Sequence, residues 1–257
     1  MPRISPTDFD DMGSSSESPV AEATVKRLLA VLVVLAGVSA AQAQILLPPA
    51  APFGWNAGDP NTTAFHWNNF AAGGTYPGPF VPDQAAFHPG LANASLMETL
   101  GGGFLTGGGN LYSQGVPMHI AATLPNYDFS TSPSGGWSTT VYVQTRTLGN
   151  ELDYAGLTLN WIDLAGAHTL TPASAFLNQE LEHTPLGGFG GFAATHLWGF
   201  AVPASPSQFT LSFGGALDSV SLDQLRVDTQ VSPVPEPSSL LLLTGAGLAF
   251  WRRQRRR

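Results

Sequence analysis

The sequence contains no cysteine, only one lysine, Lys26, and few charges: 11% of its 257 residues are Asp, Glu, Lys or Arg. The absence of cysteine excludes disulfides, thiolate metal sites and cysteine nucleophiles. Glycine and proline are abundant instead, with 29 and 21 residues, and both disfavour helices. Because 43% of the residues are hydrophobic, the chain has enough apolar surface to fold. The composition therefore predicts an all-β domain with many turns.

Positive charge is concentrated at the C-terminal end, and the middle of the chain is acidic. Residues 44–232 contain twelve acidic side chains but only two basic ones, Arg146 and Arg226. A protein that binds nucleic acid needs a cationic surface for the phosphates. We therefore expect no nucleic acid partner. Five of the ten basic residues stand at the end of the chain: Arg252, Arg253, Arg255, Arg256 and Arg257.

The N-terminal region has the three parts of a secretory signal peptide. Lys26 and Arg27 precede the apolar stretch 28–38, which is followed by a small-x-small pattern at Ala41 and Ala43. The stretch is too short for an ordinary spanning helix, which takes about 20 residues. An uncleaved anchor or a core helix remains the alternative.

We expect residues 26–43 to form a signal helix that the export machinery recognises, with cleavage before Gln44. Residues 1–25 are a polar, Ser-rich lead of unusual length. A translation start at Met12 would shorten this lead. The mature protein would then begin at Gln44 in either case.

The C-terminal end also has three parts, in the order Pro235-Glu236-Pro237, apolar run 240–251 and arginine cluster. Prolines cannot continue a helix, so the apolar run predicts a separate short membrane helix. Its aromatic end would lie at the membrane interface, and the arginines would stay on the cytoplasmic side. The expected anchor residues are Leu240, Leu241, Leu242, Leu243, Trp251, Arg252, Arg253, Arg255, Arg256 and Arg257.

This tripartite tail, residues 233–257, resembles the PEP-CTERM sorting signal. The resemblance implies recognition of Pro235, Glu236 and Pro237 by an exosortase, a transpeptidase-like membrane enzyme. It also implies an exported protein that is membrane-anchored before processing and is delivered to the cell envelope or outer surface. Proteins with this tail have diverse ectodomains, so the tail implies no activity for the rest of the chain.

Residues 44–232 are predicted to form one ectodomain, an antiparallel β-sandwich. Hydrophobic and polar residues alternate in several segments, which places each set on one face of a strand. A sheet with one buried, hydrophobic face and one solvent-exposed, polar face is typical of a sandwich of two antiparallel sheets. The alternating sets are Phe65 and Trp67; Met118, Ile120, Ala122 and Leu124; Val141, Val143, Thr145 and Thr147; Leu157, Leu159 and Trp161; and Phe209, Leu211 and Phe213.

Three loose patterns, at residues 109–113, 144–149 and 220–227, make this ectodomain look like a jelly-roll or lectin-like sandwich. In the last pattern the hydrophobic parity changes between Leu222 and Leu225. One extra residue in the strand would restore the inward face. We therefore expect a β-bulge near Asp223 and Gln224.

Two short helices interrupt the expected strands. Ser95 and Glu98 have the spacing of a capping box, and residues 172–183 have hydrophobic side chains at helical spacing after a proline. For the second segment, a strand plus a loop is the alternative. The glycines predict a loop at 101–109 and a turn at 188–193.

Acidic residues offer two candidate chemistries. Glu151 with Asp153, and Glu180 with Glu182, would each share a face of an extended strand, and glycosidases use two carboxyls about 5–9.5 Å apart. Carboxylates near the last strand could instead hold a structural Ca²⁺, although solvated charges at a sheet edge are the stronger expectation. Apart from that ion we expect no cofactor. The three carboxylates concerned are Asp218, Asp223 and Asp228.

The histidines and tryptophans provide weaker indications. None of the six histidines has the spacing of a zinc site, so no metal site is predicted. The flat tryptophan rings suit stacking on sugars, but most are expected in the core or at an interface. Among Trp55, Trp67, Trp137, Trp161 and Trp198, we expect Trp161 in the core and Trp137 exposed.

The sequence as a whole favours a non-enzymatic protein of the envelope or extracellular matrix. It would be sorted by an exosortase-type system and would bind polysaccharide weakly through a sheet face. A carbohydrate-active enzyme and a purely structural or adhesive surface protein are the two alternatives.

Overall fold

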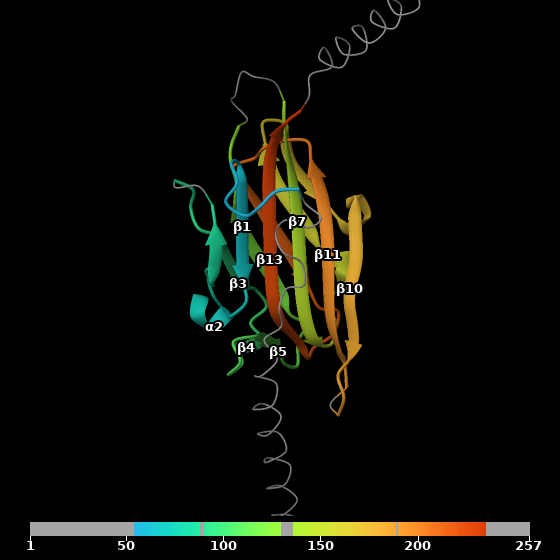
Figure 1. Ribbon diagram of the computed structural model, residues 1–257. Coiled ribbons are helices and arrows are strands. Elements are labelled where there is room, and N and C mark those ends of the chain that lie inside the picture. Colours follow the sequence, from blue (N-terminus) through green and yellow to red (C-terminus); the bar gives the residue numbers. More distant parts are fainter. Residues whose placement is uncertain (1–53, 88–89, 130–135, 189, 235–257) are drawn as a thin grey trace, which may run out of the picture. The chain divides into compact units, whose positions relative to one another are not determined.

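The computed structural model describes residues 54–87, 90–129, 136–188 and 190–234. Within these ranges the chain forms two antiparallel β-sheets packed face to face, with only short helical turns (Figure 1). The predicted all-β antiparallel sandwich is confirmed, whereas its jelly-roll detail stays a prediction. The expected signal helix, 26–43, and membrane helix, 240–251, lie outside the described residues.

The larger sheet, sheet A, has eight strands with β7 and β13 at its centre. Its main path is β10-β11-β7-β13-β1-β2, and β5 pairs with both β13 and β4. The two central strands are long enough to pair along 13 positions, from Val220 opposite Gly149 to Pro233 opposite Trp137. The strands are β1 (Thr62–Trp67), β2 (Gln84–Ala86), β4 (Gly103–Leu105), β5 (Leu111–Ser113), β7 (Trp137–Gly149), β10 (Leu177–Pro185), β11 (Phe192–Val202) and β13 (Val220–Pro233).

The smaller sheet, sheet B, has five strands in the order β3-β6-β12-β8-β9. Its central strand β12 pairs with β6 along seven positions and with β8 along three. The strands are β3 (Ser95–Glu98), β6 (His119–Pro125), β8 (Thr158–Asp163), β9 (Gly166–Leu170) and β12 (Gln208–Gly214).

Helical structure is limited to single turns in the described ranges: α2 (Phe70–Gly73), and the 3₁₀ turns η2 (Tyr154–Gly156) and η3 (Pro172–Ser174). Asn69 begins α2, because its side-chain oxygen accepts a hydrogen bond from the backbone N–H of Ala72. Across the described part of the chain, no helix has the length and apolar character that crossing a membrane requires.

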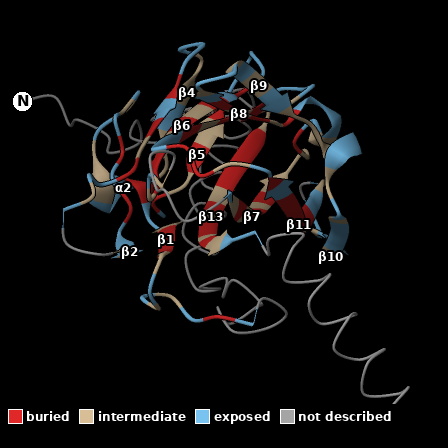
Figure 2. Cartoon of the chain, turned by 90° about the horizontal axis from the view of Figure 1, so that it is seen from above, coloured by how far each residue is buried: buried red, intermediate tan, exposed pale blue. Residues whose placement is uncertain are grey.

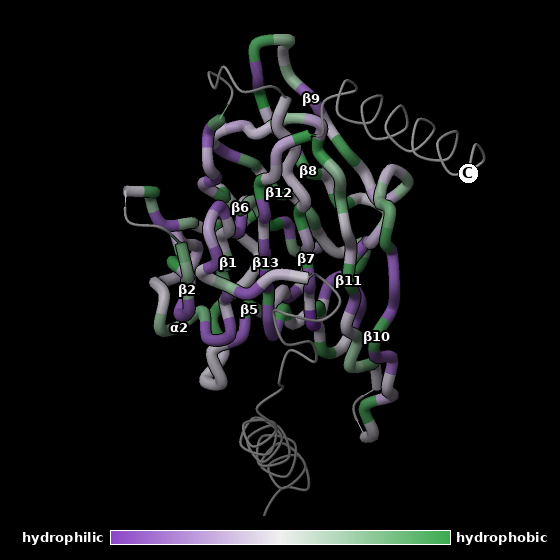
Figure 3. The backbone as a smooth tube through the Cα atoms, turned by 45° about the horizontal axis from the view of Figure 1, so that its top comes forward, coloured by the Kyte–Doolittle hydropathy of each residue, from purple (hydrophilic) through white to green (hydrophobic). Residues whose placement is uncertain are grey.

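The hydrophobic core lies between the two sheets, as the alternation predicts. Figure 2 shows buried residues along β7, β13 and β11, while β10 at the sheet edge is largely exposed. Figure 3 shows hydrophilic and hydrophobic positions interleaved along the same strands. The indole of Trp67 is fully buried and donates a hydrogen bond to the carbonyl of Phe80 at 3.0 Å. Every hydrophobic member of the predicted sets is buried.

Two helix predictions are wrong. Residues 95–98 form β3, which pairs with β6 and buries Leu96 and Glu98 while exposing Met97. Residues 172–183 form only η3 and most of β10. This agrees with the alternative prediction of a strand plus a loop. In both segments, pairing with a neighbouring strand outweighs a helical pattern of one turn or two, because short isolated helices are marginal in water.

The loop and turn predictions have different outcomes. The expected loop at 101–109 contains the short strand β4, because β5 offers it a partner for backbone hydrogen bonds. Gly188, Gly190 and Gly191 lie in the connection between β10 and β11, as expected of a glycine-rich turn, whereas Phe192 and Ala193 already belong to β11. Gly191 has a positive φ, and a β-carbon there would stand 2.5 Å from the carbonyl oxygen of Gly149, so this turn requires glycine.

The bulge predicted near Asp223 and Gln224 is confirmed. The register of β13 against β7 shifts between Leu222 and Gln224, and this returns Leu225 to the core. A second bulge, not predicted, shifts β10 against β11 between Glu180 and Glu182.

Candidate functional sites

Sites predicted at the two ends of the chain lie outside the described residues. They are the signal cleavage site at Ala41, Ala43 and Gln44, the sorting motif at 235–237, and the anchor at 240–257. Their structural placement stays a prediction. Most of the described residues with candidate chemistry lie on sheet A and at its edge.

Arg146 connects three strands on the outer face of sheet A. Its Nη1 donates to Asp223 Oδ2 at 2.6 Å, and its Nε donates to Glu182 Oε2 at 3.2 Å. The Thr195 hydroxyl also donates to Glu182 Oε2, at 3.0 Å. Burial raises the pKa of the Asp223 carboxyl, although Arg146 acts in the opposite direction. The arrangement holds β7, β10 and β13 together and pairs the charge of Arg146 with two carboxylates.

Arg226 on β13 is also paired with a carboxylate. It binds both carboxylate oxygens of Asp228, through Nε at 2.7 Å and Nη2 at 2.9 Å. Asp228 is almost fully buried, and this burial raises its pKa against the effect of the arginine. Asp223 and Asp228 are thus paired with different arginines, and neither they nor Asp218 belong to a group of three candidate ligands among the described residues.

The two predicted acidic pairs are separated by local structure. The bulge in β10 turns Glu182 to the outer face towards Arg146 and Glu180 to the inner side. Asp153 caps η2, where its Oδ1 accepts hydrogen bonds from the N–H groups of Ala155 and Gly156. Neither pair of sequence neighbours therefore acts as a pair of carboxyls on one face.

The structure instead brings Glu151, Glu180 and His183 together. His183 Nε2 lies 2.9 Å from Glu151 Oε1, and His183 Nδ1 lies 3.5 Å from Glu180 Oε1. One side-chain oxygen or nitrogen of each residue lies within 4.8 Å of those of the other two. Among the described residues, this is the one group of three acidic or histidine side chains so arranged. We call it the Glu–Glu–His cluster.

Aromatic rings surround the Glu–Glu–His cluster. Phe192 packs on the ring of His183 with centroids 4.2 Å apart, and Tyr154 stacks on His196 at 4.5 Å. Burial, together with the charges of Glu151 and Glu180, raises the pKa of the Tyr154 hydroxyl. Burial lowers the pKa of His196, so this imidazole is neutral at pH 7. The cluster thus combines two carboxylates with nearby neutral aromatic groups.

Sequence reasoning missed the Glu–Glu–His cluster because its members are far apart in the chain. Glu151 follows β7, whereas Glu180 and His183 lie on β10, two strands away. The only available indication was the spacing of Glu180 and His183. In a regular strand that odd spacing places two residues on opposite faces, and only the bulge brings them to one side.

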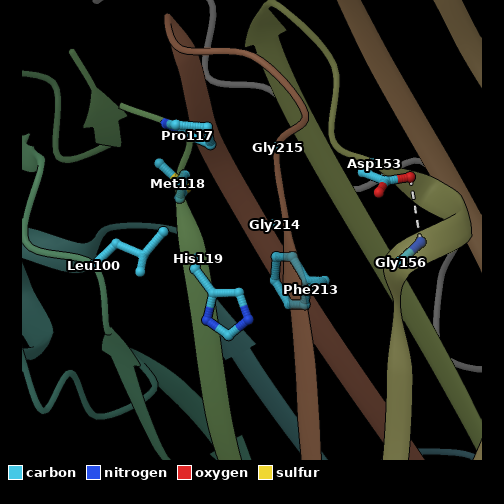
Figure 4. Close-up of a pocket in the computed structure, with 9 residues that line it drawn as sticks. All are labelled: Leu100, Pro117, Met118, His119, Asp153, Gly156, Phe213, Gly214 and Gly215. Carbon is cyan, nitrogen blue, oxygen red and sulfur yellow. Dashed lines mark hydrogen bonds between the residues drawn. The ribbon is translucent and has the colours of Figure 1, made fainter. Parts of the chain in front are cut away.

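A shallow pocket of about 180 Å³ lies between the start of β6 and the end of β12 (Figure 4). Both of its polar side chains are already hydrogen-bonded: Asp153 to η2, and His119 Nδ1 to the Thr99 hydroxyl at 2.6 Å. Pockets for small organic ligands usually measure about 300–1,000 Å³, so this one is a weak candidate. It is lined by Leu100, Pro117, Met118, His119, Asp153, Gly156, Phe213, Gly214 and Gly215.

The tryptophans are mostly structural. Trp161 is buried and stacks on His168, as expected of a core residue. Trp137 is half-buried rather than exposed, because it stacks on Phe129 with centroids 4.3 Å apart. Phe129 stacks in turn on Tyr127 at 6.2 Å. These three half-buried rings form an aromatic row near the connection between β6 and β7.

Comparison with known proteins decides the nature of the C-terminal end. Residues 233–257 match the family model of the PEP-CTERM protein-sorting motif. The chain carries a PEP-CTERM sorting motif. The protein is therefore an exported, membrane-anchored protein of the cell envelope and a substrate of the exosortase system. No curated protein and no solved structure matches the chain.

The PEP-CTERM motif begins where the last strand of the sandwich ends. Pro233 is both the final residue of β13 and the first residue of the matched segment. β13 lies between β7 and β1 in the middle of sheet A. The PEP-CTERM motif is therefore joined directly to a central strand of the fold.

Proposed function

We propose that the exported sandwich is a non-enzymatic component of the cell envelope or extracellular matrix that binds polysaccharide weakly. The aromatic row of Tyr127, Phe129 and Trp137 is the observation that supports polysaccharide binding. Its rings are half-buried and stacked on one another, so their orientation is fixed before a ligand arrives. The apolar face of a sugar ring can pack on such a surface.

The outer face of sheet A is a poorer candidate than the aromatic row. Its arginines are paired with carboxylates, and Gln144 and Gln224 on the same face are almost fully buried. From the sequence, sugar binding is expected on a sheet face. We propose instead that the sugar-binding surface is the aromatic row at one end of the sandwich. No cofactor is needed for binding of this kind.

Glycan-array binding by the full-length protein in mild detergent tests this proposal. Trp137→Ala is expected to abolish binding, because it removes the ring at the end of the aromatic row. Phe104→Ala is the matched control, since Phe104 is a partly exposed ring that packs at a tilt against Tyr112 in another part of sheet A. Equal binding by the two variants, or no binding by the unmodified protein, would contradict the proposal.

A carbohydrate-active enzyme is the second candidate. The carboxylates of Glu151 and Glu180 approach within 4.8 Å, close to the separation of about 5 Å in retaining glycosidases. Release of reducing sugar from envelope polysaccharide, lost in Glu151→Gln and in Glu180→Gln, would favour this activity. Absence of both release and array binding would favour a structural or adhesive role.

A further inference from the structure

The Glu–Glu–His cluster brings ligand atoms from two distant segments within 4.8 Å of one another. Glu180 and His183 both belong to β10, where they pair with His196 and Ala194 of β11. The bulge between them brings these two residues to the same side of the strand, where Glu151 meets them after the end of β7. Bulges often serve to redirect a side chain next to a functional site.

The charge of the cluster is not neutralised by arginine or lysine in the described part of the chain. The only basic residues between positions 44 and 232 are Arg146 and Arg226. Arg146 is bound to Glu182 and Asp223, and Arg226 is bound to Asp228. Two carboxylates therefore share one imidazole. A divalent cation between them would neutralise their mutual repulsion.

Neighbouring groups hold the three side chains in place. Phe192 packs against the ring of His183, and the Tyr154 side chain lies beside Glu151. Outer contacts of this kind orient the ligands of metal sites and increase their affinity. The carboxylate and imidazole positions are thus partly fixed without an ion.

We propose that Glu151, Glu180 and His183 form a binding site for a divalent transition-metal ion of the Zn²⁺ class. Two carboxylate oxygens and one imidazole nitrogen are a ligand set that Zn²⁺ accepts. Ca²⁺ and Mg²⁺ prefer oxygen ligands alone, so His183 discriminates against them. Both Glu180 and His183 are partly exposed to solvent, which leaves water to complete the coordination.

Calorimetric titration of the full-length, chelator-treated protein with Zn²⁺ tests the site. One equivalent is expected to bind and to raise the thermal unfolding midpoint, while Ca²⁺ at the same concentration should not compete. The double variant Glu180→Gln, His183→Asn is expected to lose more than about tenfold in affinity, the scale of losing even an outer contact. His168→Asn is the matched control, because His168 has similar exposure and pairs with Asp163 on sheet B.

Unchanged Zn²⁺ affinity in the double variant would overturn the proposal, and tighter binding of Ca²⁺ would overturn the assigned class of ion. The unmodified protein supplies a second readout that does not depend on how the variant folds. With one equivalent of Cu²⁺ in place of Zn²⁺, electron paramagnetic resonance is expected to show coupling to a single imidazole nitrogen. A spectrum without nitrogen coupling would also refute the site.

Discussion

Glu98 shows how one buried carboxylate can organise a turn. Its Oε2 accepts hydrogen bonds from the Tyr76 hydroxyl and the Gly101 N–H, both at 2.7 Å. Its Oε1 accepts from the N–H groups of Leu100 and His119. Burial alone would raise the pKa of Glu98, but these four donors outweigh it and lower the pKa below the ordinary value.

Glu98→Gln is expected to destabilise the protein by about 1–3 kcal/mol at pH 7, because the amide group would face two donors and leave them unsatisfied. The lowered pKa adds a dependence on pH. The carboxylate stabilises the fold above the unfolded-state pKa of about 4.3, and this contribution is lost as the pH falls through the folded-state pKa. Urea unfolding between pH 3 and pH 7 should therefore give a flatter profile for Glu98→Gln than for the unmodified protein.

Tyr76→Phe is the control for this prediction. It removes one of the four donors and leaves the carboxylate charged, so a smaller loss of stability and a pH profile between those of Glu98→Gln and the unmodified protein are expected. A Glu98→Gln variant as stable as the unmodified protein would show that the four hydrogen bonds contribute nothing net.

At this same residue the limits of the sequence are visible. The spacing of Ser95 and Glu98 predicts a helix start, in which Glu98 would accept a hydrogen bond from the Ser95 N–H. Residues 95–98 form β3 instead, and Glu98 accepts from N–H groups of the turn that follows it. A four-residue pattern cannot reveal that β6 is available as a partner for β3.

At the scale of elements, Arg146 links the two bulged strands of sheet A. It lies on β7 and binds Asp223 in the bulge of β13 and Glu182 beside the bulge of β10. All three side chains are at least three-quarters buried. The positive charge of Arg146 therefore balances the negative charges of two carboxylates that the bulges have turned to the same face.

Arg146→Met is expected to destabilise the protein by about 3 kcal/mol at pH 7, since removing one partner leaves a buried charge uncompensated. Without Arg146 the already raised pKa of Asp223 rises further. A carboxyl with a raised folded-state pKa costs stability once the pH is high enough to ionise it, so the loss should shrink between pH 7 and pH 4. Denaturant unfolding at both values measures this.

Arg146→Lys separates charge from geometry in this network. Lysine keeps the positive charge but lacks the two donor groups that reach separate carboxylates. An intermediate stability is expected. A loss for Arg146→Met that is equal at pH 4 and pH 7 would contradict the electrostatic account.

The strands themselves were largely predictable, whereas the sites were not. A period of two is visible in any window of several residues, which is why the core sets from Phe65 to Phe213 and the bulge at Asp223 were found. The bulge in β10 leaves no change of hydrophobic parity to detect, because β10 is an exposed edge strand. Without that bulge, the convergence of Glu180 and His183 with Glu151 cannot be inferred.

At the scale of the whole molecule, the PEP-CTERM motif determines the destination. Replacing Pro235, Glu236 and Pro237 by alanine is expected to leave the precursor unprocessed, because the exosortase would lose the segment it recognises. Mass spectrometry of both termini, in protein recovered from envelope fractions of a host with an exosortase, measures the outcome. Replacing Ser238 and Ser239 by alanine is the matched control and should be processed.

Normal processing of the alanine variant would refute the role assigned to these three residues. The same spectra would report whether the N-terminus begins at Gln44, which tests the predicted signal cleavage independently. The motif was recognisable from sequence because sorting signals are read as linear segments. The ligands of a folded domain are assembled from distant segments, and no single stretch of sequence contains them.

The junction at Pro233 has a mechanical consequence. A tether pulled from the C-terminal side loads β13 from the end where Pro233 pairs with Trp137, whereas the Glu–Glu–His cluster follows the opposite end of β7, where Gly149 pairs with Val220. A force applied between Pro233 and the Glu–Glu–His cluster would run along the strands. It would load the β13–β7 hydrogen bonds in shear, so that these bonds would have to break together rather than one after another. Such an attachment resists extraction of the last strand when flow or a neighbouring cell drags on the surface.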